Sequence, residues 1–294
     1  MTAALRKGRS HTGPLRGLSP IGAIVRRHDP DRYQTVLFAP ARCREGLFAL
    51  YAFNYEVARV RESVTQPMLG QIRLQWWREV IEAAYAGTAS RRHPVVEPLA
   101  AVIVERALSR GHFDRLIDAR EVDLADQPPA TLAALEDYCA ATSSGLIQLA
   151  LGVLGVDSRA ADGTARGIGI AYALCGLLRA MRLHAGAGRC YVPADVAGAA
   201  GFDPAEYAAL RPSLGLRRAA ETLAAAAASQ LAAARRHRRE VPHPAMPALL
   251  PGVIAERALA RLRRANFNPF DPDLAQPDPL LTWRLAGAML LGRF

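Results

Sequence analysis

The chain of 294 residues has almost no lysine and no long run of apolar residues. Lys7 is the only lysine, so arginine carries nearly all of a formal net charge of +10. Because no stretch of about 18 consecutive apolar residues occurs, we expect no membrane-spanning helix. Aromatic residues make up only 6% of the chain while alanine and leucine dominate, which favours helices over a β-sandwich. Nothing repeats at a period of about 20 to 50 residues, which argues against a solenoid.

Patterned cysteines and histidines are also missing. The four cysteines show no C-x-x-C spacing, and the seven histidines form no paired ligand motif, so we expect neither a disulfide framework nor a zinc site. A basic balance can indicate nucleic acid or an anionic membrane surface. The arginines are scattered along helical patterns, however, and no basic stripe is interleaved with aromatic residues. We therefore expect no nucleic-acid partner.

The chain divides into a short basic segment and one long helical domain. Residues 1–28 carry six basic residues and no acidic one, which predicts a basic arm without regular structure. An organellar transit peptide shares this charge bias and stays open as the alternative. From Asp31 onward, apolar residues recur with the i, i+3, i+4 spacing of buried helix faces, which predicts a single all-α domain over residues 29–294. It ends in a small amphipathic helix at about 278–294, which either docks on a membrane surface or covers the bundle.

Several segments, taken in order, resemble the squalene/phytoene synthase family. They are DRYQTVLFAPARCREGLFALYAF, QIRLQWWREVIEAAY, GLLRAMRLHAGAGRCYVP and LARLRRANFNPF. The resemblance covers about residues 30–290 and implies an isoprenoid-synthase helical bundle with a central cavity. Active members of that family carry an Asp-x-x-x-Asp pair on each of two facing helices. Carboxylates at i and i+4 share one helix face, where they hold magnesium ions that neutralise a diphosphate leaving group.

This chain departs from the family motif at three of the four aspartate positions. Those on the first helix fall at Ala58 and Glu62, and those on the second fall at Ala180 and His184. Each missing carboxylate removes about 4 kcal/mol of attraction per nearby unit charge at an effective dielectric constant of about 20. We therefore expect no catalytic residue and no metal or other cofactor. Magnesium would be needed only if the chain were an active prenyltransferase with an altered site.

Polar side chains remain around the motif helices, and the resemblance makes them candidate binding residues. They are Tyr55, Glu62, Arg179, Arg182, His184, Arg189 and Tyr191. The alternative for Glu62 is a solvated surface carboxylate, and the alternative for His184 is an interaction with a helix C-terminus. Arg179 either retains an anion site or pairs with a carboxylate of the protein, because a buried arginine needs a partner.

The replacements themselves resemble one branch of that superfamily, the mitochondrial assembly factors for respiratory complex I and their bacterial relatives. YAFNYEVARVRESV is similar to the first motif helix of that branch, where the aspartates are also absent, and GLLRAMRLHAGAGRCYVPADV is similar to the second.

The resemblance to this branch implies a non-catalytic protein that contacts a complex I subunit or assembly intermediate. We expect it in the cytoplasm, at the inner face of the respiratory membrane, or on the matrix side if the basic arm is a transit peptide. An active head-to-head prenyltransferase and a module that binds an isoprenoid or lipid in the cavity are the alternatives.

Overall fold

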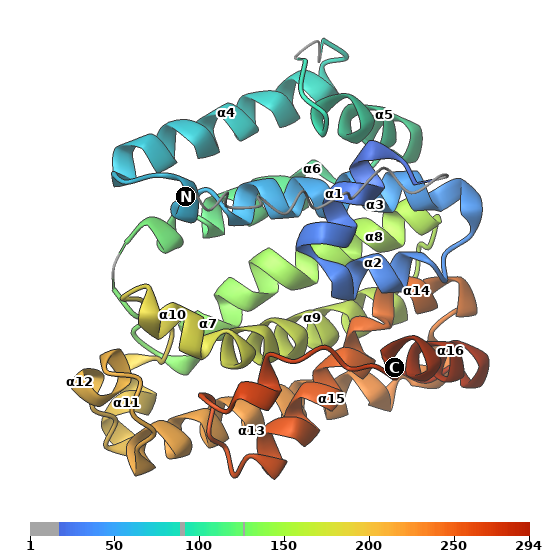
Figure 1. Ribbon diagram of the computed structural model, residues 1–294. Coiled ribbons are helices and arrows are strands. Elements are labelled where there is room, and N and C mark those ends of the chain that lie inside the picture. Colours follow the sequence, from blue (N-terminus) through green and yellow to red (C-terminus); the bar gives the residue numbers. More distant parts are fainter. Residues whose placement is uncertain (1–17, 89–91, 126) are drawn as a thin grey trace, which may run out of the picture.

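The computed structural model describes residues 18–88, 92–125 and 127–294, and these residues form helices and no strand (Figure 1). The predicted all-α fold is confirmed. The α-helices are α1 (Pro20–His28), α2 (Pro30–Val36), α3 (Ala41–Ala58), α4 (Pro67–Tyr85), α5 (Val96–Arg106), α6 (Arg110–Ala119), α7 (Leu132–Cys139), α8 (Gly145–Leu154), α9 (Arg159–Arg179), α10 (Met181–Gly186), α11 (Ala194–Ala200), α12 (Pro204–Ala208), α13 (Leu214–Arg236), α14 (Met246–Leu249), α15 (Pro251–Arg264) and α16 (Leu281–Leu291). Short 3-10 turns are η1 (Arg61–Ser63), η2 (Val122–Leu124), η4 (Arg238–Glu240), η5 (His243–Ala245) and η6 (Pro272–Leu274), and η3 (Ala140–Ser144) is a π-helical turn.

The helical domain begins earlier than the expected residue 29, because α1 (Pro20–His28) lies in the predicted basic arm. Pro20 begins the helix, where its missing N–H group costs nothing. Ile21 and Val25, one turn apart, are buried, and α1 lies against α3. The prediction of an arm without regular structure over residues 1–28 is therefore wrong for its last third. The rest of that arm, residues 1–17, lies outside the described residues.

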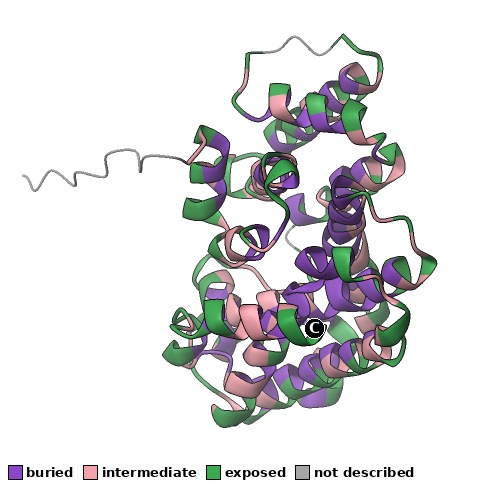
Figure 2. Ribbon diagram, turned by 90° about the vertical axis from the view of Figure 1, so that its right-hand side faces the viewer, coloured by how far each residue is buried: buried purple, intermediate pink, exposed green. Residues whose placement is uncertain are grey.

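α9 lies at the centre of the bundle, against α8, α13, α15 and the π-helical turn η3 (Figure 1). Gly169 permits the close approach to η3, because a Cβ atom there would collide with the backbone of Ser144. α3 lies against α1, α5 and α8 on the other side of this centre. Figure 2 shows buried residues concentrated on the inward sides of these helices. α3, which ends at Ala58, and α9, which ends directly before Ala180, are thus both held by extensive helix packing.

The second motif segment is divided between two helices. We expect one helix from about residue 164 to residue 184, whereas α9 ends at Arg179 and α10 begins at Met181. Ala180 lies between them with φ −89° and ψ 0°, which is outside the helical region. Arg179 therefore belongs to α9, while His184 is carried by a separate short helix.

The expected C-terminal helix is present as α16 and covers one side of the bundle. Its buried residues Leu281, Leu285 and Ala288 contact Leu250 and Ile254 at the start of α15. Figure 2 shows the C-terminus on the face turned toward the viewer. Among the described residues, no helix is both long and apolar enough to cross a bilayer.

Candidate functional site

The first pair of motif positions falls where α3 ends. Ala58 is the last residue of α3, and Glu62 follows in the turn η1 with an exposed side chain. Positions i and i+4 share a face only while the helix continues, so Glu62 does not extend the face that carries Ala58. The exposure of Glu62 agrees with the solvated carboxylate that was the alternative for this residue.

The second pair of motif positions lies at α10, where His184 contacts an aromatic ring. Ala180 is the N-cap of α10, and the imidazole of His184 lies beside the ring of Tyr191 with 4.9 Å between ring centroids. Burial, and then the positive charge of Arg189, lower the pKa of His184 below its ordinary value of 6.5. A neutral imidazole in an aromatic contact supplies no negative charge at the position of the family's carboxylate.

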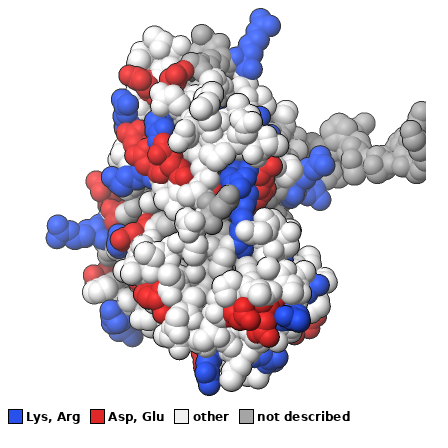
Figure 3. All heavy atoms as spheres, turned by 90° about the vertical axis from the view of Figure 1, so that its left-hand side faces the viewer, with Lys and Arg blue, Asp and Glu red and all other residues white. Residues whose placement is uncertain are grey.

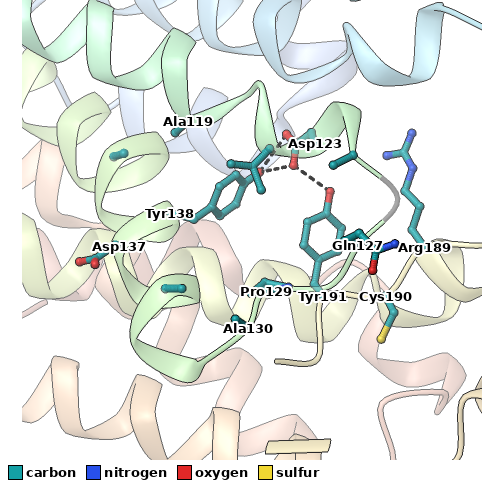
Figure 4. A pocket seen from close by; sticks show the side chains of 14 residues that line it. Ala119, Asp123, Gln127, Pro129, Ala130, Asp137, Tyr138, Arg189, Cys190 and Tyr191 are labelled. Carbon is teal, nitrogen blue, oxygen red and sulfur yellow. Dashed lines mark hydrogen bonds between the residues drawn. The ribbon is translucent and has the colours of Figure 1, made fainter. Parts of the chain in front are cut away.

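Tyr191 connects this contact to a buried carboxylate that the sequence did not single out. The Tyr191 hydroxyl donates to Oδ1 of Asp123 across 3.0 Å, and the Tyr138 hydroxyl lies 2.9 and 3.0 Å from the two Asp123 oxygens (Figure 4). Arg120 donates from Nη1 to Oδ2 of Asp123 across 3.1 Å and to the Tyr138 hydroxyl across 2.6 Å. Burial raises the pKa of both tyrosines above the ordinary value of 10, so both hydroxyls keep their protons. The Asp123 carboxylate therefore accepts hydrogen bonds from three side chains, those of Arg120, Tyr138 and Tyr191.

A weak signal for this network exists in the sequence. Arg120 directly follows α6 and Asp123 lies in η2 three residues later, a spacing at which side chains can meet within helical turns. Their contacts with Tyr138 and Tyr191 join segments that are distant in the chain, and no spacing rule predicts such pairs.

Arg179 has a carboxylate partner within the protein. Its Nη1 atom donates to Oδ2 of Asp31 across 2.8 Å, and the two side chains are 32% and 20% exposed. The pair joins the end of α9 to the first turn of α2. Of the two alternatives for Arg179, the structure therefore has the internal ion pair, which neutralises the charge that an anion site would use.

The remaining candidates do not meet at one point. Tyr55 stacks on His28 of α1 with 4.1 Å between ring centroids and 15° between planes. Arg182 is exposed on α10. The seven predicted binding residues thus divide between the contact with α1 (Tyr55), the ion pair with α2 (Arg179), the surroundings of Asp123 (His184, Arg189, Tyr191) and solvent (Glu62, Arg182).

The residues at the motif positions do not fit a magnesium cluster. Magnesium prefers carboxylate and phosphate oxygens in an octahedral shell. Ala58 and Ala180 have no donor atom, and Glu62 is exposed beyond the end of its helix. In the part of the chain that the structure describes, no group of three or more His, Cys, Asp or Glu could hold a metal ion. No metal-dependent step follows from this arrangement.

A cavity of about 430 Å³ opens beside the Asp123 network. Its walls come from the end of α6, from η2, from α7 and from the segment after α10 (Figure 4). The lining is mainly apolar, and includes Ala119, Val122, Ala134, Tyr138, Ala141 and Tyr191. No residue of α3 or α9 belongs to the lining, and the motif position nearest to it is His184, whose ring contacts the lining residue Tyr191.

Comparison with known proteins places these observations in one family. The sequence model described as squalene/phytoene synthase matches residues 25–285. A mouse (Mus musculus) protein named NADH dehydrogenase (ubiquinone) complex I, assembly factor 6, is 32% identical over 258 residues, which cover 88% of this chain and 77% of that protein. A presqualene diphosphate synthase of Sinorhizobium fredii is 29% identical over 165 residues, or 55% of this chain and 58% of that enzyme.

A solved structure shares the fold. The squalene synthase HpnC of Alicyclobacillus acidocaldarius superimposes with a TM-score of 0.75 at 24% identity, over 85% of this chain and 94% of that one. At this identity the likeness concerns the helical bundle alone, and the match of the family model supplies the relationship in sequence. The chain belongs to the squalene/phytoene synthase family.

Proposed function

We propose that this chain assists the assembly of respiratory complex I and does not catalyse prenyl transfer. The observation that carries the proposal is the loss of metal ligands at the motif positions. Ala58 and Ala180 have no donor atom for a metal ion, and the imidazole of His184 lies against the ring of Tyr191. The proposal is further supported by the mouse relative, which is named as a complex I assembly factor and matches most of this chain.

Chemistry supports the same conclusion. An allylic diphosphate ionises when cations neutralise the charge that develops on its leaving group. Here the charge of Arg179 is neutralised by Asp31, and Arg182 is exposed to water, where its attraction for a phosphate is weak. Binding of a diphosphate by the remaining arginines would not by itself break the carbon–oxygen bond.

The partner we propose is a complex I subunit or an assembly intermediate. The place of action is then the cytoplasmic face of the respiratory membrane, or its matrix face if residues 1–28 include a transit peptide. A peripheral membrane contact is part of this proposal, and the exposed side of α16 supplies a surface for it. Trp283 and Leu290 on that side are 77% and 87% exposed.

A prenyltransferase with an altered metal site is the second candidate function. It is favoured by the likeness to presqualene diphosphate synthase and by the carboxylate that Glu62 keeps at one motif position. Only this candidate would require magnesium. A protein that holds an isoprenoid or other lipid without chemistry is a third candidate, favoured by the apolar cavity.

Deletion of the gene separates these functions. We expect assembled, active NADH dehydrogenase to fall while the isoprenoid pool stays unchanged, and we expect Glu62→Gln to restore assembly as well as the wild-type chain does. A loss of isoprenoids with normal NADH dehydrogenase would contradict the proposal. Turnover of farnesyl diphosphate by the purified protein with magnesium, abolished by Glu62→Gln, would also contradict it.

A further inference from the structure

We propose that a basic groove between α9 and α13 binds an acidic segment of a protein partner. The groove shares no lining residue with the cavity beside Asp123 and includes none of the four motif positions. The proposal rests on the assembly role only for the identity of the partner, which would be a complex I subunit or an assembly intermediate.

Small residues keep this groove open. Its volume is about 430 Å³, and it lies where the first half of α9 packs beside the end of α13 (Figure 1). Gly167 permits the close packing, because a Cβ atom there would lie 2.9 Å from the carbonyl oxygen of Gln230. One turn earlier, a Cβ atom at Gly163 would meet nothing within 4 Å. Ala160 and Ala233 complete this narrow, uncharged floor.

The free charge in the groove is positive. Arg159 and Arg166 line it with exposed side chains, and neither has an ion-pair partner among the described residues. The lining carboxylate of Glu240 is engaged, since its Oε1 atom lies 3.1 Å from Nδ1 of His237. Asp162, between the two arginines in the sequence, does not belong to the lining.

The spacing of the two arginines fits an extended polypeptide. Seven residues of helix separate Arg159 from Arg166, which corresponds to about 10 Å along the axis. An extended chain rises about 3.3 Å per residue, so carboxylates about two or three residues apart reach both guanidinium groups. Each contact is then a charge-assisted hydrogen bond.

Further arginines extend the positive charge beyond the groove. Arg236, at the end of α13, and Arg238 and Arg239, in η4 against α9, have no ion-pair partner in the part of the chain that the structure describes. Figure 3 shows a different pattern on the face at the left of Figure 1, beyond the other end of α9, where acidic and basic groups lie side by side. The uncompensated charge at the groove attracts an acidic segment to this end of the molecule.

The lining favours a polypeptide over a bilayer or a nucleic acid. Among the described residues, no large exposed apolar side chain lies in the segments of α9 and α13 that line the groove, whereas helices that bind bilayers place apolar residues beside basic ones. The described lining also contains no Phe, Tyr or Trp on which a base could stack. Arginines around a small, neutral floor fit carboxylate side chains on an extended chain.

The test is calorimetric titration of the full-length protein with a 12-residue peptide of alternating glutamate and alanine, at low ionic strength. We expect this peptide to bind and its glutamine–alanine counterpart not to bind. Arg159→Glu with Arg166→Glu should weaken binding about tenfold or more. Arg182→Glu with Arg211→Glu is the matched control, because it changes the net charge equally at two exposed arginines outside the groove, and it should bind like the wild-type protein.

A filling variant tests the shape of the groove separately from its charge. Gly163→Trp places a large side chain over the floor and should weaken binding of the acidic peptide about tenfold. Ala232→Trp, at an exposed residue of α13 outside the lining, is its control and should leave binding unchanged.

Three results would overturn the proposal. They are no binding of the acidic peptide by the wild-type protein, equal losses in the groove variant and its charge-matched control, and a larger loss of binding to phosphatidylglycerol vesicles or single-stranded DNA than to the peptide in Arg159→Glu with Arg166→Glu. None of these results bears on the assembly role. Conversely, normal NADH dehydrogenase after deletion of the gene would refute the assembly role and leave the peptide titration as it stands.

Discussion

Arg179 and Asp31 are 148 residues apart in the chain, yet Nη1 of the arginine lies 2.8 Å from Oδ2 of the aspartate. Arg179 is the residue next to a motif position on α9, and Asp31 lies in the first turn of α2. Arg179, which the sequence offers as a candidate for an anion site, instead holds the N-terminal part of the chain against the central helix. Arg179 thus helps to hold α2 against α9, so replacing it should lower the free energy of unfolding.

Arg179→Gln should lower the free energy of unfolding by about 1 to 3 kcal/mol, because it leaves the largely buried carboxylate of Asp31 without its partner. Asp31→Asn should have a similar effect, and the double variant should lose less than the sum of the two. Urea unfolding of the four proteins measures this coupling. Arg182→Gln, an exposed residue of α10, is the control and should be near neutral. Additive effects of the two single variants would contradict the ion pair.

The Asp123 network predicts a graded series of stability losses. Asp123→Ala leaves Arg120, whose side chain is only 16% exposed, without its carboxylate and should cost about 3 kcal/mol. Tyr191→Phe removes one donor and keeps the ring beside His184, so we expect a loss of about 1 kcal/mol. Asp137→Ala, at the exposed side of the same cavity, is the matched control and should change stability little. An equal effect of Asp123→Ala and Asp137→Ala would show that the network is not formed.

The sequence predicts the bundle and the loss of the metal ligands, because both depend on local patterns. Helical periodicity marks the buried faces, and the resemblance to the family locates the four motif positions within two short segments. The sequence does not predict the partners of the remaining polar residues. Arg179 meets Asp31, and Tyr191 meets Asp123, across long stretches of chain, and such pairs are set by tertiary packing. α1 was missed because only three of its nine residues, Ile21, Gly22 and Val25, are buried, which is too short a pattern to mark a helix at the sequence level.

The environment of His184 predicts a contribution to acid sensitivity. Burial lowers the pKa of His184 in the folded state below 6.5, so the unfolded chain takes up this proton first as the pH falls. The free energy of unfolding should therefore decrease as the pH falls through 6.5, and this contribution should level off below the folded-state pKa. His184→Phe keeps a ring beside Tyr191 and removes the titration, so its stability should depend less steeply on pH between about 7.5 and 5.

Burial also lowers the pKa values of His28 and His112, so part of the acid sensitivity should remain in the His184→Phe variant. The measurement is urea unfolding of the wild-type and variant proteins at a series of pH values. Parallel stability curves for the two proteins would mean that His184 titrates alike in the folded and unfolded states.

The outward side of α16 predicts where the protein contacts a membrane. Trp283 and Leu290, 77% and 87% exposed, are seven residues apart and so lie on one face of the helix, with Arg284 and Arg293 as the nearby basic residues of this segment. Insertion of two large apolar side chains contributes about 1.5 to 3 kcal/mol each, and arginines favour anionic lipids. Trp283→Asp with Leu290→Asp should therefore reduce co-sedimentation with phosphatidylglycerol vesicles about tenfold or more.

Val104→Asp, at a 65% exposed apolar residue of α5, is the control and should sediment like the wild-type protein. If the α16 variant still binds these vesicles as the wild type does, the contact lies elsewhere on the surface.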